Sequence, residues 1–265
     1  MQQKNGHERD KEIVMDEGPH VYWIQGSCDN WRSVTTVIHD YFPEFQGRVV
    51  AWRMVRSKYF PHAAKYEKYR DVCKDITDPK EQVEAILQSW KKDGQHSAQL
   101  GTLLHRDIEL FFNQETVHND TKEFSYFLNF FRHVVVSRNL EPFRTEWMIF
   151  SETHRICGSI DMIFRNPKTN KFVMMDWKRS KKIHKKCAYN KELGFGPCAD
   201  LENINFHHYS LQLNLYKFLL EDKYDVQIES MHIVVFHPDN SNFLLLDVPD
   251  RRQHIQAILE DYEVK

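Results

Sequence analysis

Two aspartates and a lysine fall on consecutive strand-like segments near the middle of the chain. Asp161 closes the segment Gly-Ser-Ile-Asp, and Asp176 precedes Trp177 and Lys178. Both carboxylates interrupt apolar runs, and a buried carboxylate needs a nearby cation to remain charged. Mg²⁺ or Mn²⁺ prefers oxygen ligands, which Asp161, Asp176 and the main-chain carbonyl of Trp177 supply. Because strand residues alternate between faces, Lys178 lies on the same side as Asp176 and beside the expected ion.

This expected site depends on strands that the local pattern predicts. β-Branched and aromatic residues dominate three short runs separated by turn-forming residues, and these runs are 145–150, 155–165 and 171–177. They predict an antiparallel three-stranded meander with Glu146 on its first strand. Asp-x-Lys also occurs at Asp78/Lys80 and Asp120/Lys122, where no strand pattern surrounds it. The strand context, rather than the spacing alone, therefore selects the copy that ends at Lys178.

Helices are predicted before the meander. Apolar residues recur at helical spacing after Pro79 and again from Gly101, and residues 124–136 form another aromatic-rich helix. His105 lies on the segment that follows Gly101. If its helix face points at the aspartates, His105 is a further metal contact; otherwise it is an ordinary surface partner of Glu109.

The chain after the meander completes the fold. A helix over 205–221 carries Gln212 and Tyr216 one turn apart, and two further strands, 231–236 and 243–248, precede a closing helix. The order helices, three strands, helix, two strands, helix predicts a central mixed α/β sheet flanked by helices. We expect a disordered arm at 1–20, an N-terminal helical lobe at 21–100 and the core domain at 101–265.

Composition excludes several classes of protein. The net charge of −2 gives no sign of a general nucleic-acid binder, and no apolar run approaches the ~20 residues that cross a bilayer. Residues 1–20 lack the apolar core of a secretion signal. Five scattered cysteines without Cys-x-x-Cys predict neither a disulfide framework nor a zinc ribbon. We therefore expect an intracellular, reducing compartment, nuclear or cytoplasmic, and no membrane partner.

A basic segment begins at the expected site. No acidic residue occurs between Lys178 and Glu192, and six Lys or Arg residues fall within 178–186. Such a run is often a solvated loop or a localisation signal. Because this one starts beside the aspartates, we expect it to contact a phosphate backbone through Arg179, Lys181, Lys182, Lys185 and Lys186.

The order of these motifs resembles the PD-(D/E)XK nuclease superfamily, in particular its branch of RecB-type nuclease domains and phage λ-type exonucleases. The resemblance covers residues 101–216, and its motifs are a helical His105, Gly158-x-x-Asp161, Asp176-Trp177-Lys178 and Gln212-x-x-x-Tyr216. Residues 33–43 are more faintly similar to the N-terminal helical region of nucleases from large DNA viruses and some protists.

The resemblance implies a restriction-endonuclease-like fold and a deoxyribonuclease that uses one or two Mg²⁺ or Mn²⁺ ions. It implies an exonuclease that acts at DNA ends in replication, repair or recombination. No cysteine follows Cys198, so the iron–sulfur cluster of some relatives is not expected. No Gly-x-x-x-x-Gly-Lys-Ser/Thr occurs, so we expect no nucleotide cofactor, and any helicase motor belongs to a partner protein.

The resemblance also implies roles for individual side chains. Asp161 and Asp176 bind metal, His105 is a further ligand, and Lys178 is the catalytic lysine. The remaining members support this centre: Gln212 and Tyr216 position the nucleic acid or the lysine, and Glu146 is either a supporting base or an ordinary strand residue.

Two alternatives remain at the level of sequence. An RNA endonuclease of the cap-snatching type also places a helical histidine ahead of two acids and a lysine. The other alternative is a member of the same fold that binds nucleic acid without cutting it. Such members usually lose the lysine or one of the acids, and this chain keeps all of them.

Overall fold

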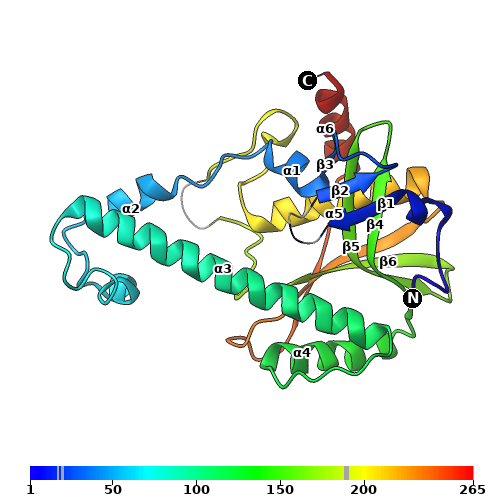
Figure 1. The fold of residues 1–265 in the computed structure, drawn as a ribbon, viewed down its shortest axis with the longest axis horizontal. Helices are drawn as coiled ribbons and strands as arrows, with labels where there is room; N and C mark the ends of the chain where they lie inside the picture. The colour runs from blue at the N-terminus through cyan, green and yellow to red at the C-terminus, as the bar shows by residue number, and fades with distance from the viewer. Residues whose placement is uncertain (17, 19–20, 188–190, 265) are drawn as a thin grey trace. The chain divides into compact units, whose positions relative to one another are not determined.

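The computed structural model describes residues 1–16, 18, 21–187 and 191–264, and it confirms the mixed α/β class (Figure 1). The described chain divides into two compact units. One unit combines residues 1–43 with the chain from Leu104 onward, and the other is Glu44–Leu103. The first unit contains the sheet and every predicted site residue.

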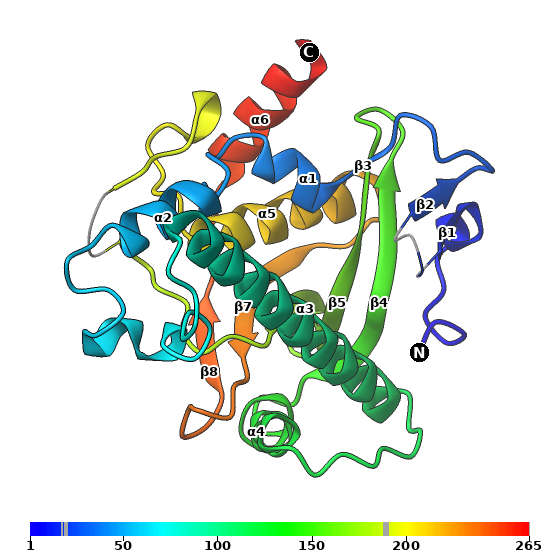
Figure 2. The same ribbon diagram turned by 60° about the vertical axis from the view of Figure 1, so that its left-hand side comes forward.

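The predicted antiparallel meander is confirmed. It consists of β4 (Glu141–Ser151), β5 (Ile156–Asn166) and β6 (Lys171–Lys178), and the two long strands β4 and β5 run side by side in Figure 2. β7 (Ile228–Val235) pairs parallel to β6, and β8 (Leu244–Asp247) pairs antiparallel to β7. The crossover between β6 and β7 contains α5 (Asn205–Lys223), as a parallel pair requires.

Each face of this sheet is covered by its own helices. One core cluster joins α1 (Val34–His39), α5 and α6 (Arg252–Val264) to apolar strand residues such as Met174 and Ile233. On the opposite face, Met175 and Val234 pack with the end of α3 (Pro79–Phe112), α4 (Lys122–Phe130) and the π-helix Phe131–Val136. Successive residues face opposite sides, so a sheet buried on both faces has near-continuous apolar strands.

The prediction of a disordered arm at 1–20 is wrong for the described residues. Residues 8–12 form a 3-10 helix, and β1 (Ile13–Asp16) pairs with β2 (Val21–Ile24). The arm is held by Asp10, whose carboxylate accepts hydrogen bonds from Arg144 Nη1 at 2.6 Å and Trp147 Nε1 at 2.9 Å. A polar segment is therefore ordered because its charges have buried partners far along the chain.

The predicted boundaries of the helical lobe also need correction. Residues 21–43 belong to the sheet unit, where β3 (Arg32–Ser33) pairs parallel to β5 and Ser33 caps α1 by accepting from the Thr36 amide. The independent unit begins at Glu44 and contains α2 (Gly47–Val55), a 3-10 helix at 64–69 and most of α3. Its small core includes Tyr69, which accepts a 2.7 Å hydrogen bond from Trp90 Nε1.

Residues 101–112 continue the helix that starts at Pro79, so α3 is a single helix of 34 residues. Among the described helices, none combines the length and the apolar character needed to span a bilayer.

Candidate active site

The candidate site lies where β6 separates from β5. The antiparallel register between them runs from Asn166/Lys171 to Met162/Met175. Beyond this point the amide of Trp177 donates to the Asp161 carboxylate, at 2.6 Å from Oδ2. A side chain therefore takes the place of the backbone acceptor at the opening between the strands, and this fixes Asp161 at that position.

His105 reaches the same place from α3. Its Nε2 lies 3.0 Å from the carbonyl oxygen of Trp177. The indole of Trp177 is buried with Phe130 and Phe236, so the carbonyl is held by the core beneath it. A carbonyl can only accept, so Nε2 carries a hydrogen and donates it. In the neutral histidine, the lone pair is then on Nδ1.

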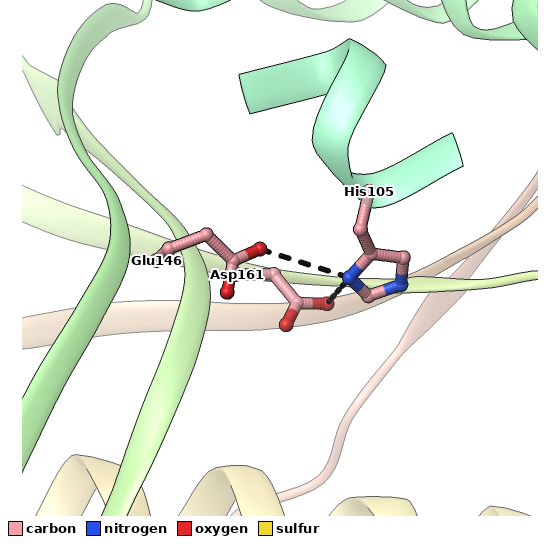
Figure 3. Close-up of side chains that lie close together, drawn as sticks. All are labelled: His105, Glu146 and Asp161. Atoms are coloured by element: carbon pink, nitrogen blue, oxygen red, sulfur yellow. Dashed lines mark ion pairs between the residues drawn. The ribbon is translucent and has the colours of Figure 1, made fainter. Parts of the chain in front are cut away.

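That second nitrogen faces two carboxylates, as Figure 3 shows. Nδ1 of His105 lies 3.7 Å from Oε1 of Glu146 and 3.7 Å from Oδ2 of Asp161. Within the described residues, these three side chains form a group whose ligand atoms all lie within 4.8 Å of one another. The structure thus brings His105 to the aspartate site and gives Glu146 a more central place than the sequence predicts.

Glu146 has an unusual backbone. Its φ is +42°, a left-handed conformation in the middle of a strand, which costs a non-glycine residue about 1–3 kcal/mol. Oε2 of its carboxylate accepts a 3.2 Å hydrogen bond from the Ser159 hydroxyl, which leaves Oε1 on the His105 side. Strained residues of this kind cluster at functional sites, because the strain aims a side chain.

Lys178 and Asp176 form a pair at the end of β6. Nζ of Lys178 lies 2.6 Å from Oδ2 of Asp176, and the side chains are 19% and 5% exposed. The ammonium also lies 4.8 Å from the ring centre of Tyr209 on α5, a cation–π contact. Tyr209 is thus a member of the site that none of the sequence motifs includes.

Burial and charge shift the pKa values of these groups in linked directions. Burial alone would lower the pKa of His105, but the carboxylates of Asp161 and Glu146 raise it to about 9. Burial raises the pKa of Asp176 to about 6 and also raises that of Asp161, against the opposing effect of Lys178. The pKa of Lys178 is raised by Asp176 and Asp161, although burial opposes this. The site is a network of partly buried charges held by mutual attraction.

The donor set of the three-residue group fits a hard divalent cation. Two ligands bound at about 2.0–2.2 Å to one ion lie about 3–4 Å from each other, a range that includes both 3.7 Å separations. The two carboxylate oxygens suit Mg²⁺ or Mn²⁺, and the imidazole nitrogen, which softer ions prefer, favours Mn²⁺ over Mg²⁺. The sequence predicts a partly different set of ligands, which includes Asp176 and the Trp177 carbonyl but not Glu146. In the structure Asp176 is paired with Lys178, and the Trp177 carbonyl accepts a hydrogen bond from His105.

Gln212 and Tyr216 meet on α5 as the motif predicts. Nε2 of Gln212 donates to the Tyr216 hydroxyl at 3.4 Å. The Tyr216 ring packs directly over Gly158, where an added Cβ would lie 2.7 Å from Cε1 and 2.9 Å from the hydroxyl. The glycine of the Gly-x-x-Asp motif therefore leaves room for the tyrosine of the helical motif, close to Asp161 on the same strand.

The basic segment divides into two parts. Arg179 does not fit the prediction of a phosphate contact, because it is paired with Glu123 at 2.7 Å and both side chains are nearly buried. The other four predicted contacts, Lys181, Lys182, Lys185 and Lys186, are exposed, and Lys181 is paired with Asp239 on the surface. Ile183 lies between Lys182 and Lys185 in the sequence, and its buried side chain anchors this segment to the core.

Comparisons with known proteins add little to this geometry. No protein-family model and no curated protein matches the chain. Among solved structures the chain is similar to an archaeal protein described as "Crystal structure of SSO0001", with 16% sequence identity and a TM-score of 0.35 over 89% of this chain and 76% of that chain. A likeness of this size carries no argument, so function must be argued from the site.

Proposed function

We propose that this protein is a metal-dependent nuclease that hydrolyses phosphodiester bonds in DNA and acts as an exonuclease at DNA ends. The observation that carries the proposal is the orientation of His105. Its hydrogen bond to Trp177 directs Nδ1 at Asp161 and Glu146, and the Asp176–Lys178 pair follows on the same strand end. The order of motifs that resembles the PD-(D/E)XK superfamily supports the same conclusion.

His105, Glu146 and Asp161 would hold the cation in this proposal. When bound, a divalent cation lowers the pKa of water and polarises the phosphate, which are the two needs of phosphodiester hydrolysis. Lys178 supplies a positive charge beside the position where negative charge develops on the phosphate. Asp176 and the Tyr209 ring hold that ammonium in place.

The remaining chain supports substrate binding. Exposed Lys182, Lys185 and Lys186 follow directly after the strand that carries Lys178, and they supply positive charge for a phosphate backbone. The overall charge of the protein is near neutral, so this local charge rather than the whole surface would attract the nucleic acid.

The test is digestion of end-labelled linear DNA and covalently closed circular DNA, single- and double-stranded, with Mg²⁺, Mn²⁺ or EDTA. We expect loss of linear DNA only, blocked by EDTA and by Lys178→Ala. Lys80→Ala is the matched control, because it removes the lysine of an Asp-x-Lys that lies outside the site.

Three outcomes would contradict the proposal. Cleavage by Lys178→Ala at the wild-type rate would remove the catalytic role of the lysine. Cleavage of RNA with DNA left intact would favour the RNA endonuclease. Binding of DNA without cleavage under any metal would favour a non-catalytic binding module.

A further inference from the structure

A pocket of about 290 Å³ opens beside the catalytic lysine proposed above. Helices α1 and α5, which lie side by side in Figures 1 and 2, form its walls. The lining residues are Thr35, Ile38 and His39 from α1, Lys178 from β6, and His208, Tyr209 and Gln212 from α5. The sequence motifs account for Lys178 and Gln212 but give no role to the rest.

Three of the seven residues that line this pocket carry rings: His39, His208 and Tyr209. His208 packs against Phe42, with ring centres 4.2 Å apart, and lies edge-on to His39 at 5.6 Å. Tyr209 adds a third ring, under the Lys178 ammonium. The exposed imidazole of His39 is thus the outer member of a group of contacting rings in which the half-buried His208 rests on the buried Phe42. Such an arrangement suits a flat aromatic ligand.

The charge and polar groups of the lining point to the same ligand class. None of its seven residues is acidic, and its cation is Lys178, which is paired with Asp176 at the end of β6. The Thr35 hydroxyl already shares a 2.9 Å hydrogen bond with the Ser33 hydroxyl, and Gln212 Nε2 already donates to Tyr216, but a hydroxyl and an amide each have capacity for more than one hydrogen bond. A ligand with a planar polar ring and an adjoining phosphate would place the ring among the histidines and the phosphate at Lys178.

We propose that this pocket binds the unpaired base of the nucleotide that adjoins the phosphate cut at Lys178. The proposal rests on the nuclease function proposed above, and it identifies the substrate as a single-stranded or frayed end. The pocket is near the lower limit of the ~300–1,000 Å³ typical of small-ligand sites, so it holds one nucleotide rather than a base pair. A paired end must therefore open before it can enter.

The experiment measures the affinity of short single strands in Ca²⁺, which takes oxygen ligands in place of Mg²⁺. A gel run alongside checks that the strands remain intact. The strands carry 2-aminopurine or an abasic nucleotide at the 5′ end, at the 3′ end or in the middle. We expect the fluorescence of 2-aminopurine at one end to change on binding, and an abasic nucleotide at that end to weaken binding about fivefold or more.

Protein variants add an independent measurement. His39→Ala should reduce the affinity for the intact strand by about fivefold or more and abolish the penalty of the abasic end, because the stacking partner is gone. His133→Ala is the matched control, an exposed histidine outside the pocket, and should bind like the wild type.

The outcomes separate this inference from the nuclease function. Equal affinity, within twofold, for abasic and intact ends would overturn the base-binding pocket even if the protein cuts DNA in Mg²⁺ or Mn²⁺. A base-dependent signal that is lost in His39→Ala would support the pocket even if no strand is cut, and the nuclease proposal alone would then fail.

Discussion

The Nε2 atom of His105 lies 3.0 Å from the carbonyl oxygen of Trp177, on a strand 72 residues further along the chain. This one hydrogen bond connects α3 to the end of β6 and sets which nitrogen of the imidazole carries the hydrogen. It therefore decides that Nδ1 is the nitrogen offered to Asp161 and Glu146. Metal-binding histidines usually donate their other N–H in this way, which orients the ring.

The first prediction is that His105→Ala weakens Mn²⁺ binding at least about tenfold. Loss of a group that only orients a metal ligand lowers metal affinity about 10- to 100-fold, and loss of the ligand itself should lower it at least as much. Calorimetric titration of the purified protein with Mn²⁺ measures this, and circular dichroism checks the fold. The control is His133→Ala, which is exposed and away from the site. Unchanged affinity in His105→Ala would remove His105 from the ligand set.

The second prediction concerns pH. The pKa of His105 is raised to about 9 by Asp161 and Glu146, although burial opposes the shift. Below pH 9 the imidazole is protonated, and a cation must displace that proton before Nδ1 can bind it. Affinity for Mn²⁺ should therefore increase with pH up to about 9. It should fall further below pH 6, where Asp176, whose pKa burial raises to about 6, becomes protonated and Lys178 loses its partner.

Calorimetry at pH 7.5 in two buffers of different ionisation enthalpy measures the protons released. We expect about one proton per Mn²⁺ in the wild type and fewer in His105→Ala. An affinity that does not change between pH 6 and 9 would contradict the proposed role of this histidine.

The meander could be predicted from sequence because its strands are long, apolar and separated by turn residues, and the antiparallel register follows from short connections. The pairing of β3 with β5 could not be predicted, because only Arg32 and Ser33 take part and two residues are too few to show an alternating pattern. The order of the N-terminal arm could not be predicted either, because the partners of Asp10 are more than 130 residues away in sequence.

The residues of the candidate site also differ in how far the sequence predicts them. Asp161, Asp176 and Lys178 stand out because charges in apolar strands require an explanation. The position of His105 depends on the rotation of α3 about its axis, which the sequence pattern of one helix leaves open. The left-handed backbone of Glu146 has no signal in sequence, since glutamate rarely adopts it.

The third prediction separates the lysine from the metal ligands. Lys178→Ala should reduce the rate of DNA cleavage about 100- to 1,000-fold, as expected for a lost group that stabilises developing charge. Its affinity for Mn²⁺ should stay within about threefold of the wild type, because the ammonium is not a ligand and its removal lessens repulsion of the cation. Asp161→Asn should lose both properties. A large loss of Mn²⁺ affinity in Lys178→Ala would mean that the lysine maintains the structure of the site instead.

The fourth prediction concerns the contact between Gly158 and Tyr216. Gly158→Ala would place a methyl group 2.7 Å from Cε1 of the tyrosine, closer than real carbon contacts, so the ring must move. We expect a loss of about 1–3 kcal/mol in the free energy of unfolding, measured in urea, together with reduced cleavage as the Gln212 contact is disturbed. The matched control is Gly101→Ala on α3, where an added Cβ meets nothing within 4 Å and should stabilise the helix by up to about 1 kcal/mol.

If Gly158→Ala and Gly101→Ala had the same effect on stability, the tyrosine would not be held against Gly158 in solution. Replacing Tyr216 with leucine in the Gly158→Ala background should restore part of the lost stability, because the smaller side chain leaves room for the methyl group, but it should not restore cleavage.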